Sequence, residues 1–127
     1  MVANKTYELR KALRATMLTV ADRVYYDQAP DNATFPYVVF DLLELTHEDG
    51  RTLMEMEVNI LDYGTSTTIA EDIADELQSM LHKADYINAY IQYSIYRGLR
   101  QKVEEEDKQL IRRRLTFEIH MHERRDM

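Results

Sequence analysis

The fold is decided by residues 35–63, which read FPYVVFDLLELTHEDGRTLMEMEVNILDY. Two runs rich in Val, Ile, Leu, Tyr and Phe flank a polar segment whose Asp49-Gly50 pair suits the positive φ of a tight turn. We therefore predict a β-hairpin. Its second run alternates strictly, as expected of a strand with one face in the core, with Met54, Met56, Val58 and Ile60 against Glu55, Glu57 and Asn59.

The first run of the hairpin alternates less cleanly. Val38, Phe40 and Leu42 share a face with Glu44, and apolar side chains also occupy the opposite face beside Asp41. This pattern predicts a bulge or a strand covered on both sides.

A helix and a short strand are expected before the hairpin. From Asn4 to about Val24 the apolar positions step by three or four, which predicts an amphipathic helix that covers the sheet, with Asn4 or Thr6 as its cap. A short strand at Tyr25 and Tyr26 follows, and then a turn-rich connection up to Thr34.

A second helix is expected after the hairpin. Thr68 and Glu71 have the spacing of a capping box, and the helix should end near Lys83. Its predicted apolar stripe is Ile69, Ile73, Leu77, Met80 and Leu81, with Ala70 and Ala74 beside it and with Asp72, Asp75, Glu76 and Gln78 pointing away.

Two further strands complete the predicted fold, one at Tyr90–Leu99 and one beyond residue 110. In the last strand Arg113 is the one charge on the apolar side, which is formed by Ile111, Leu115, Phe117, Ile119 and Met121. We expect one α+β domain over residues 1–127, an antiparallel-rich mixed sheet of about four to five strands with two helices packed on it. Segments 101–109 and 124–127 are expected to be mobile.

Composition narrows the possible functions. The chain has no cysteine, which excludes disulfides, iron-sulfur clusters and thiolate zinc sites. Its formal charge of −7 argues against general affinity for a phosphate backbone. No apolar run approaches the roughly 20 residues of a membrane span, and the N-terminus lacks the apolar centre of a signal peptide, so a soluble protein that is not exported is expected.

Motifs for catalysis or cofactor binding are scarce. None of the three glycines lies in a phosphate-binding motif, and no serine has an evident His and acid partner. His120 and His122 share a strand face with Glu118 and are the one candidate metal constellation, although ordinary polar decoration explains them more simply. We expect no enzyme activity, no cofactor and no metal.

Charge is segregated along the chain, and this suggests contact surfaces. The hairpin is acidic apart from Arg51, the segment QKVEEEDKQ carries four consecutive acids, and basic residues gather at positions 112–114. The candidate subunit or partner contacts are therefore Glu48, Asp49, Arg51, Glu55, Glu57, Glu104, Glu105, Glu106, Arg112 and Arg114.

The chain resembles the small tail terminator or tail completion proteins of long-tailed phages and prophages. The resembling stretches are RVY at 23–25, AP at 29–30, FPYVVF at 35–40, EVNILDY at 57–63, the helix AEDIADELQSML and the closing RRRLTFEIHMHE. The likeness covers about residues 23–123 and is one of element order and short apolar words, so no residue with a fixed role is carried over.

The resemblance implies a non-enzymatic virion protein that forms a ring, commonly hexameric, at the head-proximal end of the tail. Its expected partners are itself, the major tail tube protein and the head-tail connector, with DNA passing through the ring and no membrane. Acidic residues of the hairpin and of the EEED loop would then lie at subunit contacts or in the lumen. Three alternatives stay open: a head-tail joining or head-closure neck protein, a cellular module that binds a small ligand or peptide, and a metal enzyme based on His120 and His122.

Overall fold

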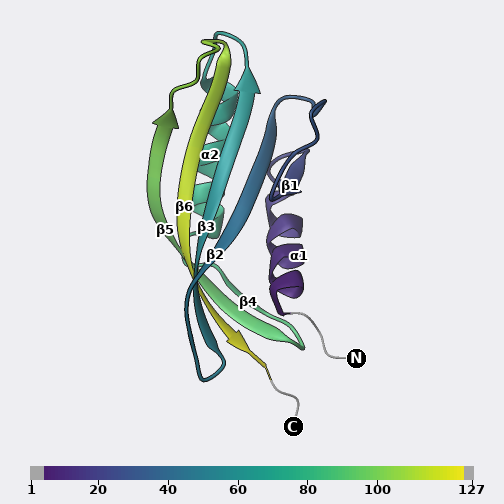
Figure 1. The fold of residues 1–127 in the computed structure, drawn as a ribbon, viewed down its shortest axis with the longest axis vertical. Coiled ribbons are helices and arrows are strands. Elements are labelled where there is room, and N and C mark those ends of the chain that lie inside the picture. Colours follow the sequence, from purple (N-terminus) through teal and green to yellow (C-terminus); the bar gives the residue numbers. More distant parts are fainter. Residues whose placement is uncertain (1–4, 125–127) are drawn as a thin grey trace.

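The computed structural model describes residues 5–124 as two helices and a six-stranded curled sheet (Figure 1). The elements in chain order are α1 (Lys5–Met17), β1 (Val24–Tyr26), β2 (Tyr37–Glu48), β3 (Arg51–Tyr63), α2 (Thr68–Leu81), β4 (Asp85–Ile87), β5 (Ile91–Val103) and β6 (Leu110–Glu123). The α+β class and the two helices are as predicted.

The strands lie in the order β1-β2-β3-β6-β5-β4. Only β1 pairs in parallel, with Val24–Tyr26 beside Val38–Phe40, and the other neighbours are antiparallel. The sheet thus has six strands where four to five were expected. The unpredicted strand is β4, which is only three residues long and too short to show a period of its own.

The predicted hairpin is confirmed as β2 and β3. Asp49 and Gly50 form its two-residue turn with φ of 52° and 77°, a conformation that glycine adopts without steric cost. The expected bulge is also present, because the register shifts between Glu44 and Thr46 and leaves Leu45 as an extra residue.

Both helices contribute to one core on the inner face of the sheet. α2 lies behind β3 and β6 in the view of Figure 1. The fully buried core side chains include Leu9, Leu13 and Met17 of α1, Leu77 and Leu81 of α2, and Phe40, Met56, Leu115 and Phe117 of the sheet. Burial on alternate strand positions confirms the predicted period of β6 and that of β3 as far as Val58. Asn59, which was predicted on the wet face, is buried because Arg112 and Arg114 of β6 lie against it.

The first helix is shorter than predicted. It ends at Met17, and Val24 belongs to β1. After Met17 the amide of Thr19 bonds the carbonyl of Thr16 over three residues, and the Thr19 hydroxyl donates to the same carbonyl at 2.7 Å, so the helical pattern is not continued. Of the predicted caps, Asn4 lies outside the described residues and Thr6 lies within the helix.

The second helix begins as predicted but is capped differently, and it ends at Leu81. Thr67 is its N-cap and makes no side-chain cap bond, so the capping box is wrong. The inward stripe is centred one position further along than predicted, because Ile69 is exposed while Gln78 is buried.

Strand β5 extends beyond its predicted end. Residues 101–103 pair with Arg112–Arg114 of β6, so the connection contains only residues 104–109. Leu99, which was predicted on the core side, is exposed because the register shifts between Arg97 and Arg100.

Candidate functional site

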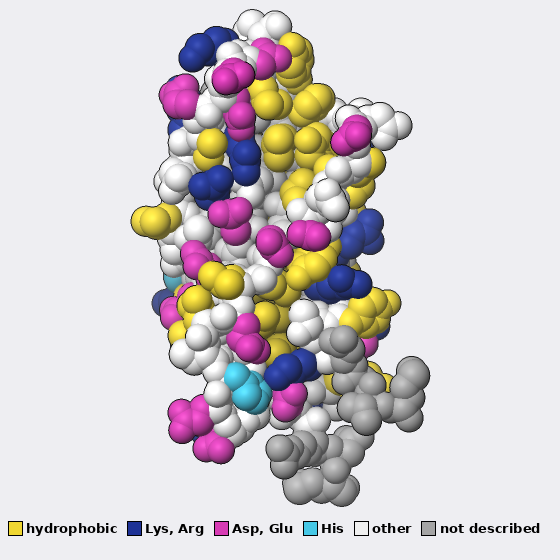
Figure 2. All heavy atoms as spheres, viewed as in Figure 1, with side chains coloured by type: hydrophobic (Ala, Val, Ile, Leu, Met, Phe, Trp, Pro, Cys, Tyr) yellow, Lys and Arg dark blue, Asp and Glu magenta, His cyan; other side chains and the backbone are white. Residues whose placement is uncertain are grey.

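The outer face of the sheet, opposite the helices, carries four of the ten predicted contact residues. On β3 and β6 the outward positions include Glu55, Glu57, Arg112 and Arg114, which alternate with buried ones. Figure 2, in the same view as Figure 1, shows acidic and basic side chains mixed with hydrophobic ones on this surface. In the view of Figure 1 no helix of residues 5–124 lies in front of β3 and β6.

A polar network joins the predicted basic and acidic residues around Asn59. Arg112 Nε donates to Asn59 Oδ1 at 2.9 Å, and Asn59 Nδ2 donates to Glu57 Oε2 at 3.1 Å. Arg114 Nε lies 3.3 Å from Glu57 Oε1, and Arg112 Nη1 lies 3.2 Å from Glu105 Oε1. The structure therefore brings Glu57, Glu105, Arg112 and Arg114 together. Asn59 was missed because only the strand register shows that both arginines lie beside it.

Towards the hairpin tip from this network, the outer face is acidic. Asp41 lies directly opposite Glu57, and Glu55 lies directly opposite Glu118. Like charges directly opposite each other on neighbouring strands destabilise a sheet. Asp41 and Glu118 were not among the predicted contacts, since their pairing depends on the register.

The remaining predicted residues lie at the two ends of the sheet. Glu48, Asp49 and Arg51 form the hairpin tip, next to a hollow of ≈ 530 Å³ that His120 and His122 also line. At the opposite end, Glu104 lies 3.3 Å from Lys102, and Glu106 is exposed. The structure does not bring these two groups together.

His120 and His122 lie near Glu118 on the outer face. His120 Nε2 lies 3.6 Å from Glu118, but no group of three His, Asp or Glu side chains among the described residues is arranged to hold a metal ion. Nor is any helix in that part of the chain long and apolar enough to cross a membrane.

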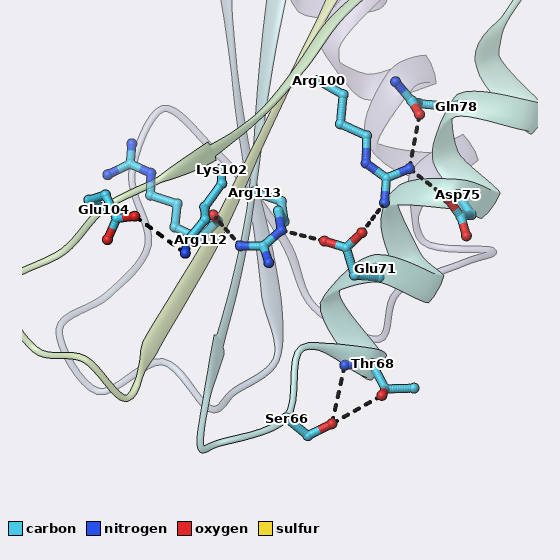
Figure 3. A network of polar contacts seen from close by, with 10 residues as sticks. All are labelled: Ser66, Thr68, Glu71, Asp75, Gln78, Arg100, Lys102, Glu104, Arg112 and Arg113. Atoms are coloured by element: carbon cyan, nitrogen blue, oxygen red, sulfur yellow. Dashed lines mark hydrogen bonds and ion pairs between the residues drawn. The ribbon is translucent and has the colours of Figure 1, made fainter.

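A second charged network fastens α2 to the sheet (Figure 3). Glu71 pairs with Arg113 and, at 2.6 Å, with Arg100, which also bonds Asp75 at 2.6 Å. Burial by itself raises the pKa of Glu71, but hydrogen bonds and charge from Arg113 and Arg100 outweigh it and lower the pKa. This network explains why Arg113 is tolerated on the apolar side and why Glu71 does not cap its helix.

The two lateral edges of the sheet are only partly covered, because β1 and β4 are short. β1 pairs with residues 38–40 of β2, and β4 pairs with residues 92–94 of β5. Residues 41–48 and 98–103 therefore have no strand on their outer side within the described chain. Leu43, Leu45 and Leu99 along these edges are exposed by 58%, 48% and 68%. Open edges that carry exposed leucines are typical of surfaces that pair with another chain.

A charged, uncovered sheet face with open edges indicates a protein that assembles with other subunits. Comparison with known proteins supports this class. The sequence matches the family described as tail completion protein gp17 over residues 7–122, and the chain belongs to that family. It is accordingly a structural protein of a phage tail and a component of a phage-like virion.

A solved structure shares the fold. A chain in "Virion of native gene transfer agent (GTA) particle" superimposes with a TM-score of 0.67 and 16% identity, covering 91% of this chain and 90% of that chain. Among the curated proteins, none matches.

Proposed function

We propose that this protein forms a ring, hexameric as the family resemblance implies, that caps the tail tube at its head-proximal end. The ring stops polymerisation of the major tail tube protein and presents the surface to which the head's connector attaches. The observation that carries this proposal is the family match over residues 7–122.

The charge of the outer face supports a place for that face in the lumen of the ring. The opposed acids Asp41, Glu57, Glu55 and Glu118 repel one another, and DNA carries a dense negative charge that such a surface does not bind. A lumen lined in this way lets DNA pass without adhering. Arg112 and Arg114 offset part of this charge by pairing with Glu105 and Glu57, but Asp41 and Glu55 have no ion pair within residues 5–124.

The test is electron microscopy of a lysate from the source phage or prophage with this gene deleted. A terminator predicts overlong tail tubes of irregular length beside filled heads. Tails of normal length lying apart from filled heads would instead assign the protein to the head-tail joining step. Intact infectious particles would contradict both functions.

The role of the β5–β6 loop is tested separately by reversing the charges of Glu104, Glu105 and Glu106. Only Glu105 has a partner on the outer face, Arg112, so we expect the loop to matter through contacts with other subunits. Loss of ring formation or of infectivity is the expected result. If both survive the triple reversal, the loop has no part in assembly.

A further inference from the structure

The open edges of β2 and β5 lie at opposite lateral edges of the sheet. This is the arrangement that a head-to-tail interface requires, in which each copy offers one edge to each neighbour. We propose that residues 43–45 of β2 in one copy pair antiparallel with residues 101–103 of β5 in the next copy. This inference rests on the proposed ring and names the strands that close it.

The charge of the two edges selects β5 as the partner of β2. Along its open edge β2 carries Asp41, Glu44 and Glu48, which are exposed and have no ion pair within residues 5–124. Pairing two β2 edges would set these acids against each other. The open part of β5 instead carries Arg100 and Lys102 and no acid, so pairing β2 with β5 joins opposite charges.

The faces of the sheet fix the register. Glu44 lies opposite Met54 and Lys102 lies opposite Arg113, so both point to the helix-covered side. A continuous sheet must keep that side common to both copies. Placing Glu44 opposite Lys102 does so. Lys102 also pairs with Glu104 at 3.3 Å, but both of those side chains are exposed, whereas a register that sets Glu44 against Arg100 meets a side chain that Glu71 and Asp75 already hold at 2.6 Å.

The same register joins apolar side chains on the outer side. Leu43 is exposed by 58% in the single chain, and it comes to lie opposite Val103 of the next copy. The register shifts after Glu44 in β2 and before Arg100 in β5 limit the paired segment, because the faces no longer match beyond them.

The pairing also sets the inclination of the strands. Within one chain, Leu43 of β2 lies level with Tyr96 of β5, because both are paired through Glu55 and Glu118 of the strands between them. Pairing Leu43 with Val103 instead of at the level of Tyr96 shifts the next copy along the strands by about six residues, or roughly 20 Å. The distance across the sheet from β2 to β2 of the next copy is four strand spacings, or roughly 19 Å. A ring that closes with this stagger needs strands inclined by about 45°, near the inclination found in closed β-barrels.

Disulfide cross-linking between introduced cysteines tests the interface. The chain has no cysteine of its own, so no native disulfide can form. Purified Leu43→Cys and Val103→Cys proteins are oxidised separately, as a mixture and as the double variant, and products are resolved on a non-reducing gel. We expect no cross-link in either single variant, a dimer only in the mixture, and a ladder that ends at the ring size in the double variant. As the matched control, Glu76→Cys, on the exposed side of α2, should give no cross-link when mixed with Val103→Cys.

Charge exchange provides the second readout. Glu44→Lys and Lys102→Glu should each reduce ring formation in mass photometry, and the double exchange should restore it. Glu76→Lys makes the same charge change as Glu44→Lys away from the edge and should form rings normally.

Three results would overturn the inference. They are cross-linking of Leu43→Cys with itself, rings in which Leu43→Cys and Val103→Cys fail to react, and failure of the double exchange to restore assembly. Rings without this cross-link, together with overlong tails in the deletion lysate, would reject the interface and leave the proposed function standing.

Discussion

Removing the charge of Glu71 should loosen α2 from the sheet. The perturbation is Glu71→Gln, which keeps the size of the side chain and some of its hydrogen bonding but leaves Arg113 without a counter-charge. The Arg113 side chain is only 12% exposed and that of Arg100 is 24% exposed. Buried pairs that lose one partner cost about 3–5 kcal/mol, and exposed ones cost about 0–1 kcal/mol.

Glu71 itself is 38% exposed, so solvent screens the network in part and an intermediate value applies. We expect a loss of about 2 kcal/mol in the free energy of unfolding at pH 7. For a chain of this size that corresponds to a fall of about 8 °C in Tm.

The effect should depend on pH with a definite sign. The folded-state pKa of Glu71 lies below its ordinary value of 4.5, so its contribution is fully present above that value. It is lost as the pH falls through the lowered folded-state pKa, because the protonated side chain no longer pairs with Arg113 and Arg100. The difference between wild type and Glu71→Gln should therefore shrink as the pH falls below 4.5.

Urea unfolding of both proteins from pH 7 downward measures this difference. Glu76→Gln is the matched control, since Glu76 lies on the exposed side of the same helix. It should change the free energy of unfolding little at any pH. An equal loss in both variants, or a loss in Glu71→Gln that does not vary with pH, would refute the reasoning.

Two further predictions concern the sheet. A Cβ at Gly98 would lie 2.7 Å from Thr116 Oγ1, which accepts a hydrogen bond from the Leu99 amide at 2.8 Å, so Gly98→Ala should lower the free energy of unfolding by about 1–3 kcal/mol. Unchanged thermal unfolding would mean that the bulge has room for a methyl group. Replacing both His120 and His122 by alanine should leave the metal content of the purified protein unchanged, measured by elemental analysis. A stoichiometric metal lost on replacement would restore the metal-site alternative.

The sequence by itself determined the elements whose pattern is carried by many residues. The alternation from Met54 to Ile60 required one buried and one wet face, and Asp49-Gly50 allowed the tight turn between two strands. The position of Arg113 on the apolar side was also readable, because strand geometry assigns every second residue to the same face. Such local rules do not depend on what lies across the sheet.

Tertiary structure decided the elements and contacts that depend on a neighbour. The three-residue strand β4 exists because β5 offers it a partner, and β5 reaches Val103 because β6 continues beside it. Glu71 had the spacing of a capping box, but two arginines from other strands bind it more strongly than a backbone amide would. The opposed acids of the outer face and the two open edges likewise follow from strand order and register, which arise from long-range pairing and not from local preference.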